Sequence, residues 1–172
     1  MPILGSDFTI VETMSDSMKS MYSLQTIPEP TFVCNYIKQH KKYDQFDLCD
    51  GSHTISNLPN AGGTSVVSET LSFEILNRMY AAKLKSTEME LRYYPLGSKI
   101  TDFSVSIYGE TIGVSVTRAM KFRGTFNDED GVRLLTKKLD GVICSSKAVL
   151  KQYRWKKQIL HIWAETKETA LS

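Results

Sequence analysis

The sequence has few cysteines, no long apolar run and almost no net charge, and each shortage argues against a class of protein. Its 172 residues contain 3 cysteines at wide spacings, which argues against a disulfide framework and a zinc ribbon. No apolar run approaches the roughly 18 residues of a membrane span, and the N-terminus has no basic start of a secretory signal. We therefore expect an intracellular protein, nuclear or cytoplasmic, that is neither secreted nor inserted in a membrane.

The sequence also lacks the short motifs of several enzyme classes. It has no G-x-x-x-x-G-K-[ST] phosphate loop, no G-x-G-x-x-G dinucleotide motif and no G-x-S-x-G nucleophile elbow. A mixed metal site from Cys34, His40, Cys49 and His53 has no spacing typical of metal ligands. We expect Cys34 and Cys144 to be small buried residues.

The near-zero total charge conceals an asymmetry between the two halves of the chain. Residues 1–86 contain 7 basic and 9 acidic side chains, whereas residues 87–172 contain 14 basic and 10 acidic ones. A bound anion is therefore expected in the second half.

The composition, with 41% hydrophobic and 23% charged residues, is that of one ordinary globular domain. We expect residues 1–64 to form an N-terminal extension and residues 65–172 to form the core domain. Within the extension, residues 1–29 predict an irregular arm, residues 31–46 a short amphipathic helix after Pro30, and residues 47–64 a loop rich in Gly, Asn, Ser and Pro.

The core domain has clearer periodicity. Helices are predicted over residues 65–84 and 128–145, and strands over residues 87–95, 99–108, 111–118 and 158–165, with another helix starting in KETALS. The second helix has an apolar stripe of the kind that packs on a core, made of Val132, Leu135, Leu139 and Val142. These elements predict an α/β (α+β) fold with a central mixed sheet flanked by helices.

This order, αβββαβ, resembles the common core of the PD-(D/E)XK nuclease-like superfamily over about residues 65–165. The resemblance implies a Glu on the first helix, an Asp near the start of the second strand, and E-x-K on the third strand. It also implies that the carboxylates hold Mg²⁺, which activates water and stabilises the charge that develops on the phosphate.

Two acids match these positions. Asp102 in KITDFSV occupies the place of the motif Asp, with Thr101 in place of the usual Pro. On the first helix, Glu69 falls within the apolar arc and Glu74 on the opposite face, so we choose Glu69 as the helix acid. The alternatives are that Asp102 is a polar residue facing solvent, and that Glu69 only favours the helix dipole.

The third motif departs from the pattern. In GVSVTRAM, Ser115 stands in the place of Glu and Thr117 in the place of Lys. A two-residue turn at 109–110 places Asp102 opposite Thr117, with Ser115 diagonal to it. Neutral hydroxyls replace neither the carboxylate that Mg²⁺ prefers nor an ammonium group. Only Glu69 and Asp102 remain as metal ligands in this alignment.

A migrated lysine would compensate for the lost motif. Lys137 or Lys138 on the second helix could reach the site from above, so Lys138 joins Glu69, Asp102, Ser115 and Thr117 as a candidate catalytic residue. The alternative is that both lysines belong to a solvated helix face.

The segment KAVLKQYRWKK, residues 147–157, contains five cations and no acid. Cations interleaved with aromatic rings suit phosphate contacts and base stacking. The candidate residues for binding DNA or RNA are Lys147, Lys151, Tyr153, Arg154, Trp155, Lys156 and Lys157. The alternative is a solvated loop with Trp155 packed on the sheet.

Three hypotheses follow. The chain is a nuclease-like domain with impaired catalysis that binds nucleic acid, an active Mg²⁺-dependent nuclease with a rearranged site, or a protein-interaction domain of a larger assembly. An acid or lysine within reach of Asp102 would favour the enzyme, a basic groove without a metal cluster the binder, and an exposed apolar patch the interaction domain.

Overall fold

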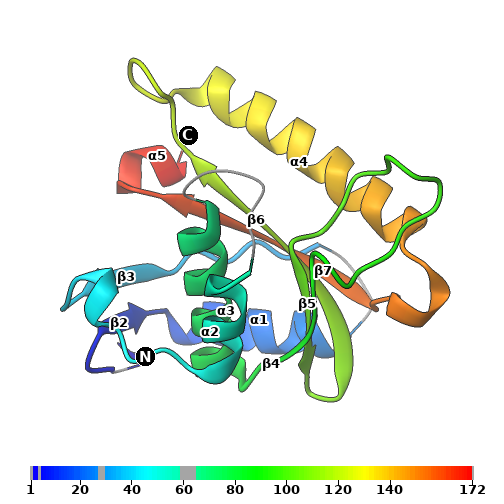
Figure 1. Ribbon diagram of the computed structural model, residues 1–172. Helices are drawn as coiled ribbons and strands as arrows, with labels where there is room; N and C mark the ends of the chain where they lie inside the picture. Colours follow the sequence, from blue (N-terminus) through cyan, green and yellow to red (C-terminus); the bar gives the residue numbers. More distant parts are fainter. Residues whose placement is uncertain (1, 4, 27–29, 59–64, 172) are drawn as a thin grey trace.

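The computed structural model describes residues 2–3, 5–26, 30–58 and 65–171, which form two sheets and five α-helices (Figure 1). The first part contains β1 (Pro2–Ile3), β2 (Phe8–Val11), α1 (Met14–Gln25), β3 (Tyr36–Gln39) and α2 (Asp50–Ser56). The second part contains α3 (Ser65–Tyr80), β4 (Lys83–Thr87), β5 (Phe103–Ile107), β6 (Glu110–Ala119), α4 (Asp128–Ala148), β7 (Lys157–Ala164) and α5 (Lys167–Leu171). Two short 3-10 helices lie at Tyr43–Gln45 and Lys151–Tyr153.

The main sheet has the strand order β4-β5-β6-β7. The first three strands form an antiparallel meander, and β7 lies parallel to β6 after the α4 crossover. A parallel pair needs such a long connection, because the chain must return to the same end of the sheet. The predicted α+β class and the αβββαβ core with a mixed sheet flanked by helices are therefore confirmed.

The two faces of the main sheet differ in chemistry. On one face, Phe103 and Val105 of β5 pack with Phe73 and Leu76 of α3 in the largest cluster of buried apolar residues. The alternating positions put Ser104, Ser115 and other small polar residues on the opposite face, toward α4. The alternation predicted for residues 99–108 thus reflects an apolar α3 side and a polar α4 side.

Local signals fix several element boundaries. Tyr108 and Gly109 both have positive φ values, of 51° and 81°, and form the two-residue turn between β5 and β6. The predicted turn at residues 109–110 is therefore wrong by one residue, because the backbone places its left-handed pair one position earlier. At the start of α4, Asn127 and Asp130 form a reciprocal capping box.

The predictions for residues 1–64 are wrong in three places. The expected arm contains β2 and α1, the helix expected over residues 31–46 is replaced by β3 and a 3-10 turn, and the expected loop contains α2. Residues 27–29 and 59–64 of these segments lie outside the described residues. Strand β2 pairs with both β1 and β3 in an antiparallel N-terminal sheet. Such pairing between distant segments overrides local propensity.

The N-terminal sheet packs on the second part of the chain. Phe8 and Ile10 of β2 bury against Ile75 of α3, and Trp163 of β7 also contacts this cluster. The ring of Trp163 donates a hydrogen bond from Nε1 to Ser72 Oγ of α3 over 2.9 Å. The expected extension and the expected core therefore share a packed interface.

The strand predicted over residues 87–95 is also wrong, because β4 ends at Thr87. The segment after Thr87 turns away from the sheet and reaches the C-terminal end of α4. There Tyr93 forms one isolated bridge with Val149, and the Tyr94 N–H donates to the Ala148 carbonyl. Its alternation reflects burial of Leu91 on one side, which a strand pattern also produces.

The predicted packing face of α4 is wrong as well. Val132, Leu135 and Leu139 are 64%, 40% and 48% exposed, whereas the buried residues of this helix are Asp130, Gly131 and Ser145. The helix turns its small and polar side to the sheet, because the sheet face below it is itself polar. The two cysteines expected to be buried, Cys34 and Cys144, are exposed.

Candidate functional site

Asp102 lies directly before β5 and carries a shifted pKa. Its carboxylate accepts a hydrogen bond from the Val116 N–H of β6, with 2.6 Å between Oδ2 and N. Burial raises the pKa of Asp102 above its usual range, although the Val116 N–H and the charge of Lys138 act in the opposite direction. The carboxyl group is therefore held at the start of β5, in a poorly solvated environment.

Glu69, near the start of α3, lies within electrostatic range of Asp102. Burial raises the pKa of Glu69 to about 7, and the negative charges of Asp102 and Glu88 add to this increase. The Lys138 charge partly offsets it. The two acids singled out in the sequence are thus brought together with the lysine on α4, while Lys137 is exposed.

Glu88, immediately after β4, is a third acid that sequence reasoning missed. Burial raises its pKa, and the charge of Asp102 raises it further. Glu88 was missed because the strand was predicted over residues 87–95, which puts Glu88 inside the strand. In the structure β4 ends at Thr87, so Glu88 follows the end of the strand. We call Glu69, Glu88 and Asp102 the carboxyl corner. It comes from α3, the residue after β4 and the residue before β5, and the charge of Lys138 acts on Glu69 and Asp102.

The third-motif residues lie on β6, beside this corner. Phe103 pairs with Val114, so continuing the register places Asp102 opposite Ser115, and the predicted pairing of Asp102 with Thr117 is wrong. The shift follows from the turn at 108–109. Thr117 instead pairs with Ile162 of β7.

Ser115 is engaged by a glutamine from the neighbouring strand. Gln158 Nε2 donates to Ser115 Oγ over 2.8 Å and to Thr101 Oγ1 over 3.0 Å. Gln158 Oε1 accepts hydrogen bonds from the hydroxyls of Ser145 and Ser146 on α4. A neutral amide network therefore occupies the position where the resemblance implies a metal-binding carboxylate.

The carboxyl corner supplies oxygen donors of the kind that Mg²⁺ prefers. Within residues 2–3, 5–26, 30–58 and 65–171, however, no three His, Cys, Asp or Glu side chains converge closely enough to hold a metal ion. Asp102 lies near enough to raise the pKa of Glu69 and of Glu88, but the three acids do not form a ready coordination shell.

Part of the predicted basic segment is used in internal contacts. The ring of Trp155 covers Gly113 so closely that a Cβ there would lie 2.8 Å from it, and Trp155 Nε1 donates to Ser146 Oγ. Lys156 Nζ lies 2.8 Å from Glu110 Oε1. Lys157 Nζ donates to the carbonyl and hydroxyl oxygens of Ser23 in α1. Trp155 therefore packs on the sheet, Lys156 forms an ion pair with the start of β6, and Lys157 bonds to α1.

The remaining cations of the segment face solvent. Lys147, Lys151 and Arg154 are exposed, and Tyr153 is half-buried. Among the described residues these three cations make no side-chain hydrogen bond or ion pair. They are the part of the segment that is available to an anionic partner.

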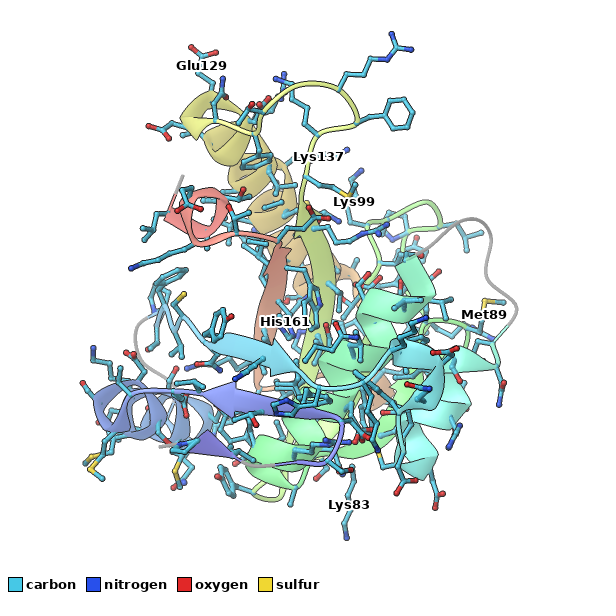
Figure 2. The ribbon with its side chains drawn as sticks, turned by 90° about the vertical axis from the view of Figure 1, so that its left-hand side faces the viewer. Lys83, Met89, Lys99, Glu129, Lys137 and His161 are labelled. Carbon is cyan, nitrogen blue, oxygen red and sulfur yellow. The ribbon has the colours of Figure 1, made fainter. Side chains whose placement is uncertain are left out.

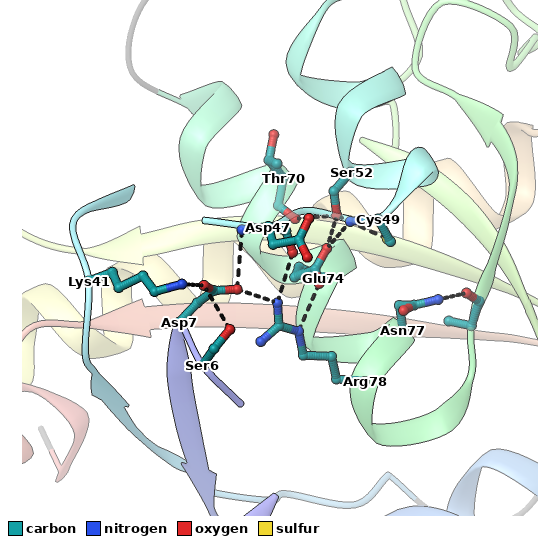
Figure 3. Close-up of polar contacts among 11 residues, drawn as sticks. Ser6, Asp7, Lys41, Asp47, Cys49, Ser52, Thr70, Glu74, Asn77 and Arg78 are labelled. Atoms are coloured by element: carbon teal, nitrogen blue, oxygen red, sulfur yellow. Dashed lines mark hydrogen bonds and ion pairs between the residues drawn. The ribbon is translucent and has the colours of Figure 1, made fainter. Parts of the chain in front are cut away.

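A second charged cluster, which sequence reasoning missed, joins β2 to α3 (Figure 3). Arg78 Nη2 lies 2.9 Å from Asp7 Oδ2, and Arg78 Nε lies 2.8 Å from Glu74 Oε1. Lys41 Nζ lies 2.8 Å from the other oxygen of Asp7. We call Asp7, Lys41, Glu74 and Arg78 the Arg78 network.

The carboxylates of the Arg78 network are almost fully buried, with Asp7 1% and Glu74 2% exposed. Burial alone would raise the pKa of Asp7, but hydrogen bonds from Lys41 and Arg78 outweigh it and lower the pKa to about 2. Glu74 also accepts from the Ser52 hydroxyl and the Cys49 N–H, and its pKa is lowered despite burial. The helix wheel placed Glu74 on an outer face because it did not include α2.

Among the residues that the structure describes, no helix combines the length and the apolar character needed to span a membrane.

His161 of β7 stacks on Trp163, with 5.1 Å between ring centroids, and burial lowers its pKa to about 4. His161 is therefore a packed residue on the edge strand of the main sheet, and Figure 2 shows it within the body of the molecule.

Comparison with known proteins finds similarity to the AAC-rich mRNA clone AAC4 protein of Dictyostelium discoideum, at 50% identity over 126 residues. The match covers 69% of this chain and 18% of that protein, so the chain spans less than a fifth of its relative's length. No family model matches the chain, and no solved structure matches it.

Proposed function

We propose that the chain is a PD-(D/E)XK-like domain that binds nucleic acid and whose cleavage site is impaired. The αβββαβ order of its core supports the resemblance, and so does the approach of Glu69 to Asp102. These are the elements and acids that the resemblance implies. A shared architecture does not by itself assign an activity, so the proposal depends on the side chains of the site.

We infer the impaired cleavage from Ser115 and its hydrogen-bond partner. Opposite Asp102, where the resemblance implies a carboxylate, a neutral hydroxyl accepts a hydrogen bond from Gln158. When bound, Mg²⁺ would activate water and neutralise charge on the phosphate. Glu69 and Asp102 would hold it without a third acid on β6, and Thr117 supplies no cation there.

The exposed cations Lys147, Lys151 and Arg154 support nucleic-acid binding. They lie at the end of α4 and in the 3-10 helix before β7. Cations that contact phosphates release condensed counterions, so their binding weakens as salt increases. Trp155 takes no part in this proposal, because its ring lies over Gly113.

The test replaces Lys151 and Arg154 by Ser and measures affinity for single- and double-stranded DNA and RNA over a range of salt. We expect weaker binding and a salt slope that is smaller by about 1 for each lost phosphate contact. Replacing Lys38 and Lys83, two exposed lysines on other strands, is the matched control and should have little effect. Equal binding by both double variants would refute the interface.

A second function, active cleavage by a rearranged site, is favoured by one observation. Glu88 and Lys138 join Glu69 and Asp102, so the corner has a third acid and a lysine from other elements. Under our main proposal, cleavage assays with Mg²⁺ or Mn²⁺ give no product. Product formation that disappears in both Asp102→Ala and Glu88→Gln would establish the rearranged enzyme. Product formation that survives Asp102→Ala would place the chemistry elsewhere.

A further inference from the structure

The α4 helix turns apolar side chains to solvent and polar side chains to the main sheet. Its exposed apolar residues recur every three or four positions, which places them along one face of the helix. They are Val132, Leu135, Leu139 and Ile143, between 40% and 64% exposed. The inward face instead contains Ser145 and Ser146, which bond to Gln158. We call these four residues the α4 stripe.

The described part of the chain leaves the α4 stripe open to solvent. Figure 1 shows α4 along the upper edge of the ribbon, and Figure 2 shows Glu129 at the end of α4 farthest from the N-terminal sheet. The loop before α4 adds Phe122, which is 93% exposed. An apolar row of this kind on an outer helix is typical of an interaction surface.

The α4 stripe is complementary to itself in the antiparallel direction. Consider two copies of α4 that pack antiparallel, with Thr136 of one copy facing Leu139 of the other. In this register Val132 at one end of the stripe faces Ile143 at the other end, so the two stripes overlap along their full length. The same register places Asp128 opposite Lys147. The helix has acids in its first turn and Lys147 in its last, so each end meets the opposite charge.

We propose that the α4 stripe is the contact surface for a second copy of this chain, in a two-fold dimer with antiparallel α4 helices. Such an interface is isologous, because the same residues serve both copies. A helix of 21 residues is about 31 Å long. The stripe occupies only its central part and is smaller than a typical stable interface. The dimer is therefore weak and forms with increasing concentration.

This inference does not rest on the proposed nucleic-acid function, although Lys147 belongs to both surfaces, so Lys147→Asp is used to measure dimerisation only. Lys151 and Arg154 lie beyond the end of α4 and make no contact in the register described. Loss of nucleic-acid binding in the Lys151 and Arg154 variant therefore says nothing about dimerisation. Loss of dimerisation likewise leaves the carboxyl corner intact.

The first experiment measures sedimentation of the whole chain over a wide range of protein concentration, with reducing agent present because Cys144 is exposed. We expect a monomer that converts to a dimer. Leu139→Glu should weaken dimerisation roughly tenfold or more, because it puts a charge near the centre of the contact, and Ile143→Glu, at the end of the stripe, should weaken it by less. Cys144→Glu, an exposed position of α4 outside the stripe, is the matched control and should dimerise normally.

The second experiment tests the antiparallel register by exchanging charges. Asp128→Lys and Lys147→Asp should each weaken dimerisation several-fold, and the double variant should restore it. Helix content of each variant is checked by circular dichroism. A wild-type chain that stays monomeric at every concentration overturns the inference, as does a dimer that persists in Leu139→Glu. A dimer that the double variant does not restore overturns the antiparallel register.

Discussion

Two acids five residues apart on α3 have opposite electrostatic environments. Glu74 is buried with Arg78, Ser52 and the Cys49 N–H, and its pKa is lowered. Glu69 is half-buried near Asp102 and Glu88, and its pKa is raised to about 7. The sign of the shift depends on whether burial is accompanied by donors and cations or by other acids.

The comparison separates a structural charge cluster from a candidate functional one. In the Arg78 network each buried carboxylate has a cation within 3 Å, and the guanidinium also stacks over the Phe8 ring at 4.2 Å. In the carboxyl corner burial raises the pKa of all three acids, and the charge of Asp102 raises the pKa of Glu69 and Glu88 further, with Lys138 as a partial counter-charge for Glu69 and Asp102. Grouped acids with raised pKa values are found more often at functional sites than in packing networks.

Removing the cation of the Arg78 network should have the largest effect on stability. Arg78→Met leaves Glu74 without its ion pair and Asp7 with only Lys41, so we expect a loss of about 3 to 5 kcal/mol in the free energy of unfolding. Denaturant titration measures it. The control is Arg133→Met, because Arg133 also pairs with an acid but is 77% exposed. That change should be below about 1 kcal/mol, and equal losses would contradict the distinction.

Removing the charge of Glu69 should change the free energy of unfolding in the opposite direction, toward higher stability. Its pKa is about 7 in the folded protein against 4.5 ordinarily, so the folded state binds this proton more tightly. Its contribution to stability therefore falls as the pH rises from 4.5 to about 7. Glu69→Gln removes this dependence and should stabilise the protein above pH 7 by roughly 1 kcal/mol, a discounted value because Glu69 is partly solvated.

The matched control for Glu69→Gln is Glu74→Gln on the same helix. The pKa of Glu74 is lowered, so its contribution is present above its ordinary value of 4.5 and is lost as the pH falls. This variant should be less stable than the wild type at neutral pH. Unfolding free energies at about pH 4 and about pH 8 distinguish the two. Destabilisation by both variants at the higher pH would show that the comparison is wrong.

The smallest effect is expected from Lys41, which is 39% exposed. Lys41→Met leaves Asp7 with Arg78 and should cost about 1 kcal/mol at neutral pH. The pKa of Asp7 should rise from about 2, so less stability remains to be lost as the pH falls below its ordinary 3.8. Acid titration of unfolding measures this, with Lys38→Met on β3, three residues earlier, as the control. Unchanged acid behaviour would remove Lys41 from the network.

The elements of the second part were predictable because their signals are local. The alternation around Phe103 and Val105 and the acidic start of α4 at Asp128 each depend on neighbours in sequence. Asp102 and Glu69 could be singled out for the same reason. The hairpin was misplaced by one residue, since the sequence does not state that Tyr108 takes a left-handed conformation.

The first part was not predictable in the same way. Strand β3 is defined by its pairing with β2, more than 20 residues earlier, and Lys41 by its contact with Asp7. One local signal was present, because Thr13 caps α1 by accepting a hydrogen bond from the Asp16 N–H. The pattern of a cap followed by an acid three residues later could have identified that helix.

The sequence by itself determined the order of elements in the core, the alternation that gives the main sheet one apolar face, and the acids Glu69 and Asp102. Only the tertiary structure decided which acids acquire cations, that Glu88 joins the corner, and that α4 turns its apolar stripe outward. Periodicity records which side chains share a face. Which face becomes buried depends on the segments that pack against it, and those segments come from distant parts of the chain.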